Sequence, residues 1–391
     1  MNEWDFLKIR QMGTVITGKT PSKNAPSEWG EDYNFVTPSD YRNYFKYART
    51  SSRKLSELGF NSHKKRLIPK NSVLVTCIGS DMGKTVLNSS DCFTNQQINS
   101  LIPNNSVIDY DFAYYLFKNN EAVFKSLGSD GTAVPILNKS DFENIDFLIP
   151  DLPEQKAIAS VLSSLDDKID LLHRQNKTLE SMAETLFRQW FDVDSNDEWQ
   201  EKNVLDIFTL VGGGTPKTSV AEYWTDEIPW ISGGDISAAH QGYLYSTEKS
   251  ISLAGLQNSS AKLLPKNSTV ISARGTVGKY ALLARDMAFS QSNYGIVSKI
   301  GSYPFFIYLL VGFIVDDLLT AAYGSVFDTI TTRTFESVNL KFPSLNSIEK
   351  FNEEISPIFS KKETNTQQIK TLENLRDTLL PKLMSGEVRV Q

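Results

Sequence analysis

Two long stretches of the chain, about 153–191 and 346–386, place apolar side chains in alternating steps of four and three residues. A period of about 3.5 residues gathers such side chains on one side of a helix and is typical of a coiled-coil seam. Pro153 and Glu154 suit the first turn of the first helix, where no amide hydrogen is needed and negative charge is favoured. The expected seam comprises Ile158, Leu162, Leu165, Ile169, Leu172, Asn176, Leu179 and Leu186 in the first helix, and Phe351, Ile355, Ile358, Asn365, Ile369, Leu372, Leu379 and Leu383 in the second.

Polar side chains interrupt both seams. Each carries one asparagine, Asn176 or Asn365, and the second also carries Lys362 and Arg376. A seam asparagine lowers stability but can fix the register of two paired helices. We therefore expect the two helices, each about 55 Å long, to pair with each other; amphipathic helices that pack separately on domain cores remain the alternative. Several acids off the seam face either a partner or solvent, namely Asp166, Asp167, Asp170, Glu180 and Glu184.

The regions before the helices alternate short β-branched and aromatic runs with Gly, Pro and Asn. Runs such as Ser72–Ile78 and Ser268–Ala273 are typical of strands between turns. The acidic segment 192–198 indicates a linker between the halves. The predicted class is α+β, with a mixed domain at 1–150, a helix at 151–191, the linker, a second mixed domain at 199–343, and a second helix with its tail at 344–391.

These segments form an internal repeat with a shift of about 190–195 residues. Matching segments occur in the same order in both halves, which indicates a duplicated domain. Two related copies in one chain can pair their helices antiparallel about a pseudo-twofold axis. The clearest matches are Gly18–Pro21 with Gly213–Pro216, Leu67–Ser72 with Leu263–Ser268, Lys177–Glu180 with Lys370–Glu373, and Glu184–Leu186 with Asp377–Leu379.

Composition excludes several classes of protein. Two cysteines and three scattered histidines in 391 residues cannot form a disulfide framework or a four-cysteine zinc site, and we expect no metal. The sequence lacks 18 uninterrupted apolar residues and a signal-like start, so we expect a cytoplasmic protein without a membrane span. The net charge is −6, yet residues 42–66 hold eight basic side chains against one acid, Glu57.

This basic segment and the Gly-rich turns suggest contact with DNA. Arg and Lys neutralise phosphates, Arg can bond two guanine acceptors, and Gln suits adenine. A solvated loop and purely structural turns are the alternatives. The candidate DNA-contacting residues are Thr20, Lys23, Tyr41, Arg42, Lys46, Arg49, Arg53, Lys54, Lys64, Lys65, Arg66, Lys84 and Gln96 in the first copy, and Thr215, Lys217, Asp235, Arg274, Lys279 and Gln291 in the second.

Sequence signals for catalysis are weak. The segment Gly79–Thr85 resembles a phosphate-binding loop, but three residues separate its glycines where that loop needs four. The chain also lacks the Asn/Asp-Pro-Pro-aromatic motif of amino-methyltransferases and the Gly-x-Gly-x-x-Gly of dinucleotide sites. We therefore expect no bound cofactor and no catalysis by this chain.

The segments Leu152–Ala159 and Leu375–Val388 are very similar to the corresponding parts of Type I restriction–modification specificity subunits. So are Gly214–Pro216, Ile228–Ile231 and Ser272–Gly278 in the second domain, and the resemblance covers the whole chain in order. It implies two target-recognition domains that each read one half of a split DNA sequence, and two helical regions that set the gap. It also implies a complex with two methyltransferase subunits and, for restriction, two translocase–nuclease subunits, which would bind S-adenosylmethionine and ATP.

The first domain departs from this pattern at two places. Thr37–Asp40 stands where the second domain has Ser232–Asp235, and Ile78 stands where it has Arg274. We therefore expect different half-sites and an asymmetric target. A coiled-coil scaffold that presents two ligand-binding domains to protein partners is the alternative function.

Overall fold

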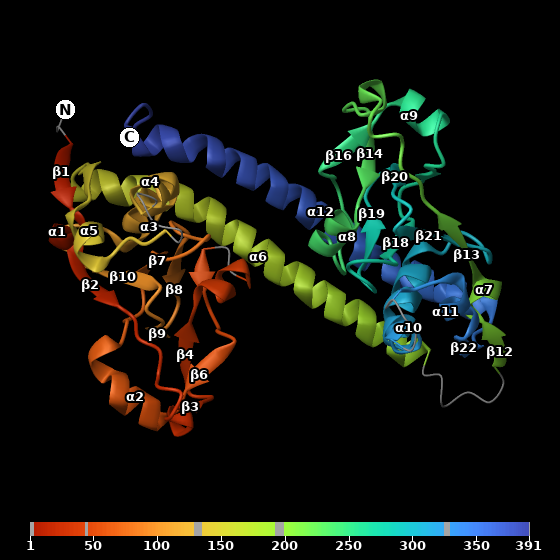
Figure 1. Ribbon diagram of the computed structural model, residues 1–391, viewed down its shortest axis with the longest axis horizontal. Coiled ribbons are helices and arrows are strands. Elements are labelled where there is room, and N and C mark those ends of the chain that lie inside the picture. The colour runs from red at the N-terminus through yellow and green to blue at the C-terminus, as the bar shows by residue number, and fades with distance from the viewer. Residues whose placement is uncertain (1–3, 44–45, 129–134, 192–198, 324–328, 391) are drawn as a thin grey trace. The chain divides into compact units, whose positions relative to one another are not determined.

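The computed structural model describes residues 4–43, 46–128, 135–191, 199–323 and 329–390 (Figure 1). The predicted linker 192–198 lies outside the described residues. Contacts divide the chain into two compact units, Met1–His173 with Gln367–Gln391, and Arg174–Thr366. The long helices α6 (Leu152–Trp190) and α12 (Leu345–Met384) each contribute one part to each unit. The linear domain boundaries given above remain a prediction.

The first unit contains a five-stranded sheet in the order β2-β10-β7-β8-β5 and a four-stranded sheet in the order β3-β6-β4-β9. A two-stranded ladder, β1 with β11, closes the domain just before α6. The strands are β1 (Asp5–Lys8), β2 (Gly13–Thr17), β3 (Trp29–Gly30), β4 (Tyr33–Val36), β5 (Tyr47–Ala48), β6 (Arg53–Leu55), β7 (Val73–Thr76), β8 (Thr85–Asn88), β9 (Phe93–Thr94), β10 (Ile98–Pro103) and β11 (Asp146–Ile149). The helices are α1 (Ile9–Met12), α2 (Glu57–His63), α3 (Tyr110–Asn119), α4 (Glu121–Leu127) and α5 (Lys139–Asn144), with 3₁₀ turns η1 (Pro26–Glu28), η2 (Pro38–Asn43) and η3 (Lys64–Arg66).

The second unit repeats this plan. Its five-stranded sheet has the order β13-β21-β18-β19-β15, its four-stranded sheet the order β16-β14-β20-β17, and β12 pairs with β22. The strands are β12 (Gln200–Asn203), β13 (Phe208–Gly212), β14 (Ile228–Ile231), β15 (Tyr243–Leu244), β16 (Lys249–Ile251), β17 (Leu263–Leu264), β18 (Thr269–Ser272), β19 (Tyr280–Leu283), β20 (Met287–Phe289), β21 (Asn293–Ser298) and β22 (Asn339–Phe342). The helices are α7 (Val204–Ile207), α8 (Gly233–Ala238), α9 (Leu253–Gln257), α10 (Pro304–Tyr323) and α11 (Thr332–Glu336), with the 3₁₀ turn η4 (Ala221–Tyr223).

The sequence repeat has a structural counterpart in the turn that precedes the central strands. Asn71 and Asn267 adopt φ values of 65° and 66°, the left-handed region that asparagine tolerates better than most residues. In both copies a lysine precedes this asparagine, and the amides of Lys70 and Lys266 donate to an aspartate at 2.8 Å. The repeated Pro-Lys-Asn-Ser sequence therefore encodes the same turn twice.

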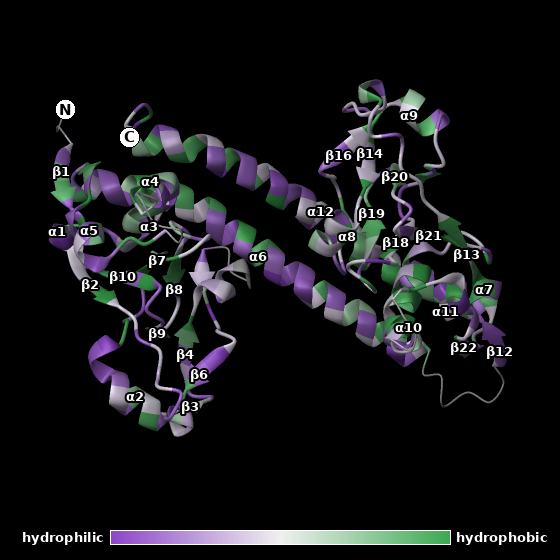
Figure 2. Cartoon of the chain, viewed as in Figure 1, coloured by the Kyte–Doolittle hydropathy of each residue, from purple (hydrophilic) through white to green (hydrophobic). Residues whose placement is uncertain are grey.

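The two long helices run antiparallel in each unit. In the first unit Ile158 and Leu162, near the start of α6, share a core with Leu380 and Leu383, near the end of α12. In the second unit Phe187 and Ala183, late in α6, share a core with Phe351 and Ile355, early in α12. Hydrophilic and hydrophobic bands alternate along both helices in Figure 2. The predicted fold class, tandem mixed domains with an antiparallel helix pair, is confirmed.

The seam asparagines bond to each other within the second unit. The Nδ2 of Asn365 donates to the Oδ1 of Asn176 at 3.0 Å, and the Nδ2 of Asn176 donates to the Oγ1 of Thr366 at 3.2 Å. Asn365 is fully buried. A hydrogen-bonded polar pair in an apolar seam favours one register, because a slip would leave buried amides unpaired.

The core of each unit extends beyond the predicted seam. Phe187 and Phe359 are buried, although neither belongs to the expected stripe. Leu165, Leu179, Leu186 and Ile358 from that stripe are only partly buried. Because the mixed domains pack against the helices, the buried face of each helix is wider than the contact between two helices alone.

One helix among the described residues, α10, is long and apolar enough to cross a membrane by length and composition. Half of its most apolar window is buried inside the second unit, where Phe306, Tyr308 and Leu310 belong to the main core. The core helix of a folded domain meets the same criteria of length and composition, so the apolar character of α10 is explained by its packing in the core.

Candidate nucleic-acid interface

The basic segment of the first copy does not form one continuous patch, and Lys46 lies inside the protein. Only 1% of its surface is exposed. Its ammonium pairs with Asp111 at 2.6 Å, donates to the Oγ of Ser163 at 2.8 Å, and lies 5.0 Å from the centre of the Tyr115 ring. The expectation that Lys46 contacts DNA is therefore corrected: this lysine joins the domain to α3 and α6.

Tyr41 also belongs to the interior, because it packs in a core cluster with Val36 and Ile68. We remove it from the candidate surface for that reason. The side chain of Arg42 lies outside the described residues.

The face of α6 in the first unit holds the domain through acidic side chains. Asp170 accepts a hydrogen bond from Arg49 at 2.7 Å, and Asp167 accepts one from the Tyr47 hydroxyl at 3.1 Å. Burial, reinforced by nearby carboxylates, raises the pKa of Tyr47, so its hydroxyl stays protonated as a donor. Asp170 is therefore buried against its own domain, whereas Asp167 bonds to the domain and remains exposed.

The remaining basic side chains divide into two groups. Arg53 is exposed and lies 3.4 Å from the ring centre of Trp29, and Lys54 is 3.4 Å from Glu31. Lys64, Lys65 and Arg66 form the exposed 3₁₀ turn η3. Arg66 donates to the carbonyl of Thr17 at 2.6 Å, which brings η3 beside the segment that leads to Thr20.

Thr20 and Gln96 were predicted separately, and the structure brings them together. The Thr20 hydroxyl donates to the Gln96 Oε1 at 2.8 Å. The second copy repeats this contact between Thr215 and Gln291. Both glutamines are exposed. Because threonine occupies only one lone pair of the amide oxygen, each glutamine keeps its NH₂ group and a second lone pair for an outside partner.

Asp235 has a structural role that the sequence interpretation missed. Its carboxylate accepts hydrogen bonds from the Ser232 amide at 2.8 Å, the Ser232 hydroxyl at 2.7 Å and the Glu248 amide at 2.9 Å. With these donors the carboxylate caps α8 and anchors the loop before β16. We therefore correct the expectation that it contacts DNA.

Asp40 in the first copy does the same with Thr37 and Ser52. Burial acts to raise the pKa of Asp40, but the hydrogen bonds from Ser52 and Thr37 outweigh it and lower the pKa. Each copy therefore uses an aspartate to hold the same loop, and the match of Thr37–Asp40 with Ser232–Asp235 reflects folding.

The Gly-rich turns adopt a conformation that requires glycine. Gly79 and Gly83 have φ values of 94° and 91°, and Gly275 and Gly278 have 79° and 80°. A Cβ at Gly83 would lie 2.3 Å from the Glu121 carbonyl oxygen, so this glycine is needed for packing as well.

Basic side chains flank these turns differently in the two copies. Lys84 pairs with Asp81 at 2.7 Å. In the second copy Arg274 is exposed, and within the described ranges no carboxylate pairs with it. Lys279 is half-buried, whereas Lys217 and Lys23 are exposed.

The described residues offer little for catalysis. Nowhere in 4–43, 46–128, 135–191, 199–323 and 329–390 do three or more His, Cys, Asp or Glu gather as a metal site. Burial raises the pKa of both Cys77 and Cys92 to about 12, so neither thiol forms a ready nucleophile at neutral pH.

Comparison with known proteins agrees with this architecture. The model of the Type I restriction modification DNA specificity domain matches the chain twice, at residues 1–181 and 196–375. The MjaIX specificity subunit of Methanocaldococcus jannaschii is 28% identical over 100% of this chain and 94% of its own length. The HindI specificity subunit of Haemophilus influenzae is 22% identical over 83% of this chain and 88% of its own length.

The fold agrees as well. The crystal structure of the Type I restriction–modification S subunit from M. genitalium superposes with a TM-score of 0.63 at 16% identity, covering 97% of this chain and 96% of that one. The chain therefore belongs to the Type I restriction–modification specificity family and carries one copy of the family's domain in each half.

Proposed function

We propose that this chain reads a two-part, asymmetric DNA sequence as the specificity subunit of a Type I restriction–modification complex. One recognition domain, residues 1–150, serves one half-site, and the other, residues 199–343, serves the other. The observation that carries the proposal is that both copies keep the same framework while their exposed side chains differ. The Thr–Gln pair and the loop-anchoring aspartate occur twice, which fits two readers of unlike sequences.

The proposed DNA surface keeps the exposed and half-buried members of the predicted set; Arg49 is left out because its guanidinium pairs with Asp170 at 2.7 Å. In the first copy it comprises Thr20, Lys23, Arg53, Lys54, Lys64, Lys65, Arg66, Lys84 and Gln96; in the second copy it comprises Thr215, Lys217, Arg274, Lys279 and Gln291. Phosphate contacts from the lysines would set position and affinity. Base-edge contacts are assigned to Gln96, Gln291 and Arg274, since Gln suits adenine and Arg suits guanine.

The helix pair is assigned the role of spacer and of docking surface for two methyltransferase subunits and, where restriction occurs, two restriction subunits. Family membership supports this assignment. Those partners would supply all the chemistry, so this chain contributes no catalysis and binds no cofactor in the reaction. Action on DNA inside the cell would place the complex in the cytoplasm.

The experiment is to co-express the chain with the methyltransferase subunit encoded beside it and to map methylated adenines across the genome by single-molecule sequencing. We expect methylation in a split motif, two specific blocks around a fixed run of unspecified bases. A soluble complex with a competent methyltransferase and no new methylation would contradict the proposal and favour a protein-interaction scaffold. Exchanging residues 1–150 for the equivalent domain of a relative is the matched control, because only one of the two blocks should then change.

A further inference from the structure

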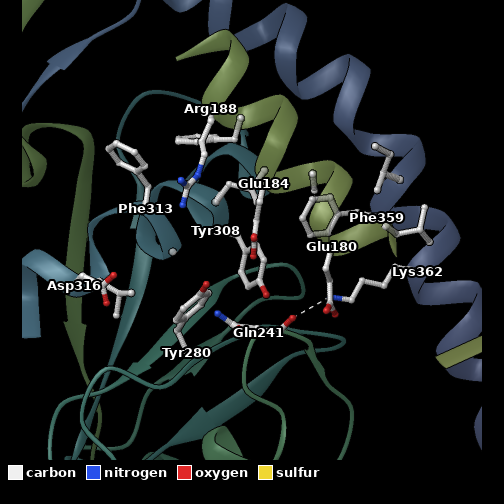
Figure 3. A pocket seen from close by; sticks show the side chains of 17 residues that line it. Glu180, Glu184, Arg188, Gln241, Tyr280, Tyr308, Phe313, Asp316, Phe359 and Lys362 are labelled. Atoms are coloured by element: carbon white, nitrogen blue, oxygen red, sulfur yellow. Dashed lines mark hydrogen bonds and ion pairs between the residues drawn. The ribbon is translucent and has the colours of Figure 1, made fainter. Parts of the chain in front are cut away.

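The second unit contains a cavity of about 220 Å³ between α6, α10, α12 and the start of β19 (Figure 3). A cavity of roughly 150 Å³ is large enough for benzene, so this one has room for a small planar group with a short chain. Three acids and two bases line it, namely Glu180, Glu184, Asp316, Arg188 and Lys362. The charge of the lining is therefore negative by one.

Much of this charge is already neutralised within the protein. The Lys362 ammonium pairs with Glu180 and donates to the Gln241 carbonyl at 3.0 Å. Glu184 points into the same space in Figure 3 and has no ion-pair partner in the part of the chain that the structure describes. Arg188 and Lys362 line the same cavity, and Glu184 acts to raise the pKa of Lys362, but neither cation forms a direct ion pair with the Glu184 carboxylate.

A buried hydroxyl also points into the cavity. Tyr308 is 5% exposed, lines the cavity, and its hydroxyl makes no hydrogen bond with any residue that the structure describes. Burial raises the pKa of Tyr308 far above its ordinary value, so the group remains a neutral hydroxyl. This hydroxyl can therefore donate to, or accept from, a polar group that enters the cavity.

The internal repeat indicates which ligand fits. The register that matches Lys177–Glu180 with Lys370–Glu373 also matches Glu184 with Asp377. In the same register Ala183, which lines the cavity, corresponds to Arg376. The second unit therefore has a methyl group where the first unit has a guanidinium.

In the first unit the Arg376 guanidinium is bound by two carboxylates. Its Nη1 lies 2.8 Å from Asp166 and its Nη2 lies 2.8 Å from Asp377. The Tyr115 hydroxyl donates to the same Asp166 at 2.7 Å. Burial opposes the charge of Arg376, but the hydrogen bonds to Asp377 and Asp166 outweigh it and raise the arginine's pKa. Two carboxylates thus bind the guanidinium, and a tyrosine hydroxyl holds one of them in place.

The second unit retains part of this site. Glu184 takes the position of Asp377. Tyr308 lies edge-on to Phe359 with ring centres 5.6 Å apart. In the first unit the corresponding contact is the hydrogen bond from Tyr115 to Asp166. The arginine is missing, and so is the carboxylate of Asp166; the cavity is lined at these two positions by Ala183 and Phe359. Phe359 in the place of Asp166 offers an aromatic face, on which a planar guanidinium stacks well.

We propose that this cavity binds a guanidinium group, supplied by a free arginine-like molecule or by an arginine side chain of a partner protein. Glu184 would accept its N–H groups in a two-bond contact, the Tyr308 hydroxyl would accept a third, and Phe313 and Phe359 would pack against its plane. The inference is independent of DNA reading, because it depends only on how the second unit differs from the first.

The test is calorimetric titration of the full chain with butylguanidinium at about 150 mM salt, where exposed charges are largely screened. We expect one bound equivalent, and binding of the neutral isostere butylurea at least about tenfold weaker, since charge-assisted hydrogen bonds are roughly twice as strong as neutral ones. Glu184→Gln preserves shape and should weaken butylguanidinium by about tenfold. Ala183→Arg gives the second unit the arginine that Arg376 supplies in the first unit, and it should abolish binding.

Arg376→Ala is the mirror variant, because it opens the equivalent position in the first unit and should raise the stoichiometry from one to two. Equal binding of butylguanidinium and butylurea, or binding unchanged in folded Ala183→Arg, would overturn the proposal. If either arginine variant fails to fold, Glu184→Gln and the urea isostere still decide the question. Displacement of butylguanidinium by the methyltransferase subunit would assign the group to a partner arginine, and lack of displacement would assign it to a free molecule.

Discussion

The buried lysine of the first unit gives the most direct test of the structural account. Lys46→Met removes an ammonium that pairs with Asp111 at 2.6 Å and bonds Ser163 at 2.8 Å. Methionine keeps most of the side-chain volume, so the loss is mainly electrostatic. Removing one partner of a buried ion pair costs about 3–5 kcal/mol. Since Asp111 can relieve part of this by taking up a proton, we expect a loss of about 3 kcal/mol near pH 7.

The same variant should show a distinctive pH dependence. Burial raises the pKa of Asp111 even though Lys46 acts to lower it, so removing Lys46 should raise the pKa further. A carboxyl whose pKa is higher in the folded than in the unfolded state lowers the stability of the protein at high pH. This loss is absent below the carboxyl's unfolded-state pKa of about 3.9 and grows as the pH rises towards its folded-state pKa. The loss caused by Lys46→Met should therefore shrink as pH falls from 7 towards 5.

The assay is urea denaturation of the full chain at both pH values, followed by a double-mutant cycle with Asp111→Asn. Lys54→Met is the matched control, because Lys54 pairs with the exposed Glu31 at 3.4 Å and such pairs contribute about 0–1 kcal/mol. Asp111→Asn in the Lys46→Met background should recover part of the loss. If Lys46→Met costs no more than Lys54→Met, or if its cost does not depend on pH, the assigned role of Lys46 is refuted.

Four further changes test other parts of the structure. Replacing both seam asparagines, Asn176→Leu with Asn365→Leu, should stabilise the chain by about 1 kcal/mol but weaken the specification of register, measured by urea denaturation and by the heterogeneity of interhelical cross-links. Arg66→Ala should weaken DNA binding by the assembled complex equally for all sequences and reduce the slope of log affinity against log salt by about one, in fluorescence anisotropy with Lys70→Ala for comparison. Gln96→Ala should alter one block of the methylated motif and Gln291→Ala the other, as seen by methylome sequencing; a change in both blocks from one substitution would contradict the assignment. Insertion of seven residues into α6 and the matching seven into α12 should lengthen the unspecified run between the blocks, and an unchanged run would refute the spacer role.

The backbone plan could be predicted because it is encoded in spacing. The heptad stripe predicted the antiparallel helix pair, and the repeated Pro-Lys-Asn-Ser turn marked equivalent points in both domains. These signals are local or periodic, so they need no knowledge of tertiary contacts. Even the charged interruptions Lys362 and Arg376 were placed on the stripe correctly, and each has a carboxylate partner on α6.

Side-chain roles were harder to predict, because they depend on partners distant in sequence. Lys46 lies in a run of basic and aromatic residues that looks like a DNA-binding loop. Its partner Asp111 lies on α3, beyond β8 and β10 in the sequence, so only the tertiary fold brings the two charges together. Asp235 was expected to contact DNA, although Ser232 three residues before it is a typical cap partner and indicates a capping role. Thr20 and Gln96 were both chosen, but only the sheet brings them into contact.

Comparison of the two copies adds information that neither copy gives alone. The amide of Leu87 donates to the Lys46 carbonyl at 2.9 Å, and the amide of Leu282 donates to the Gly242 carbonyl at the same distance, so Lys46 and Gly242 occupy one backbone position. In the first unit the joint between domain and helices holds the cations Lys46 and Arg376. In the second unit Gly242 and Ala183 stand at those positions, Lys362 supplies a cation from α12, and a cavity remains beside Glu184. Because the duplicated backbone is the same at both joints, this difference lies in the side chains, and the joint of the second unit is the one that can still accept a group from outside.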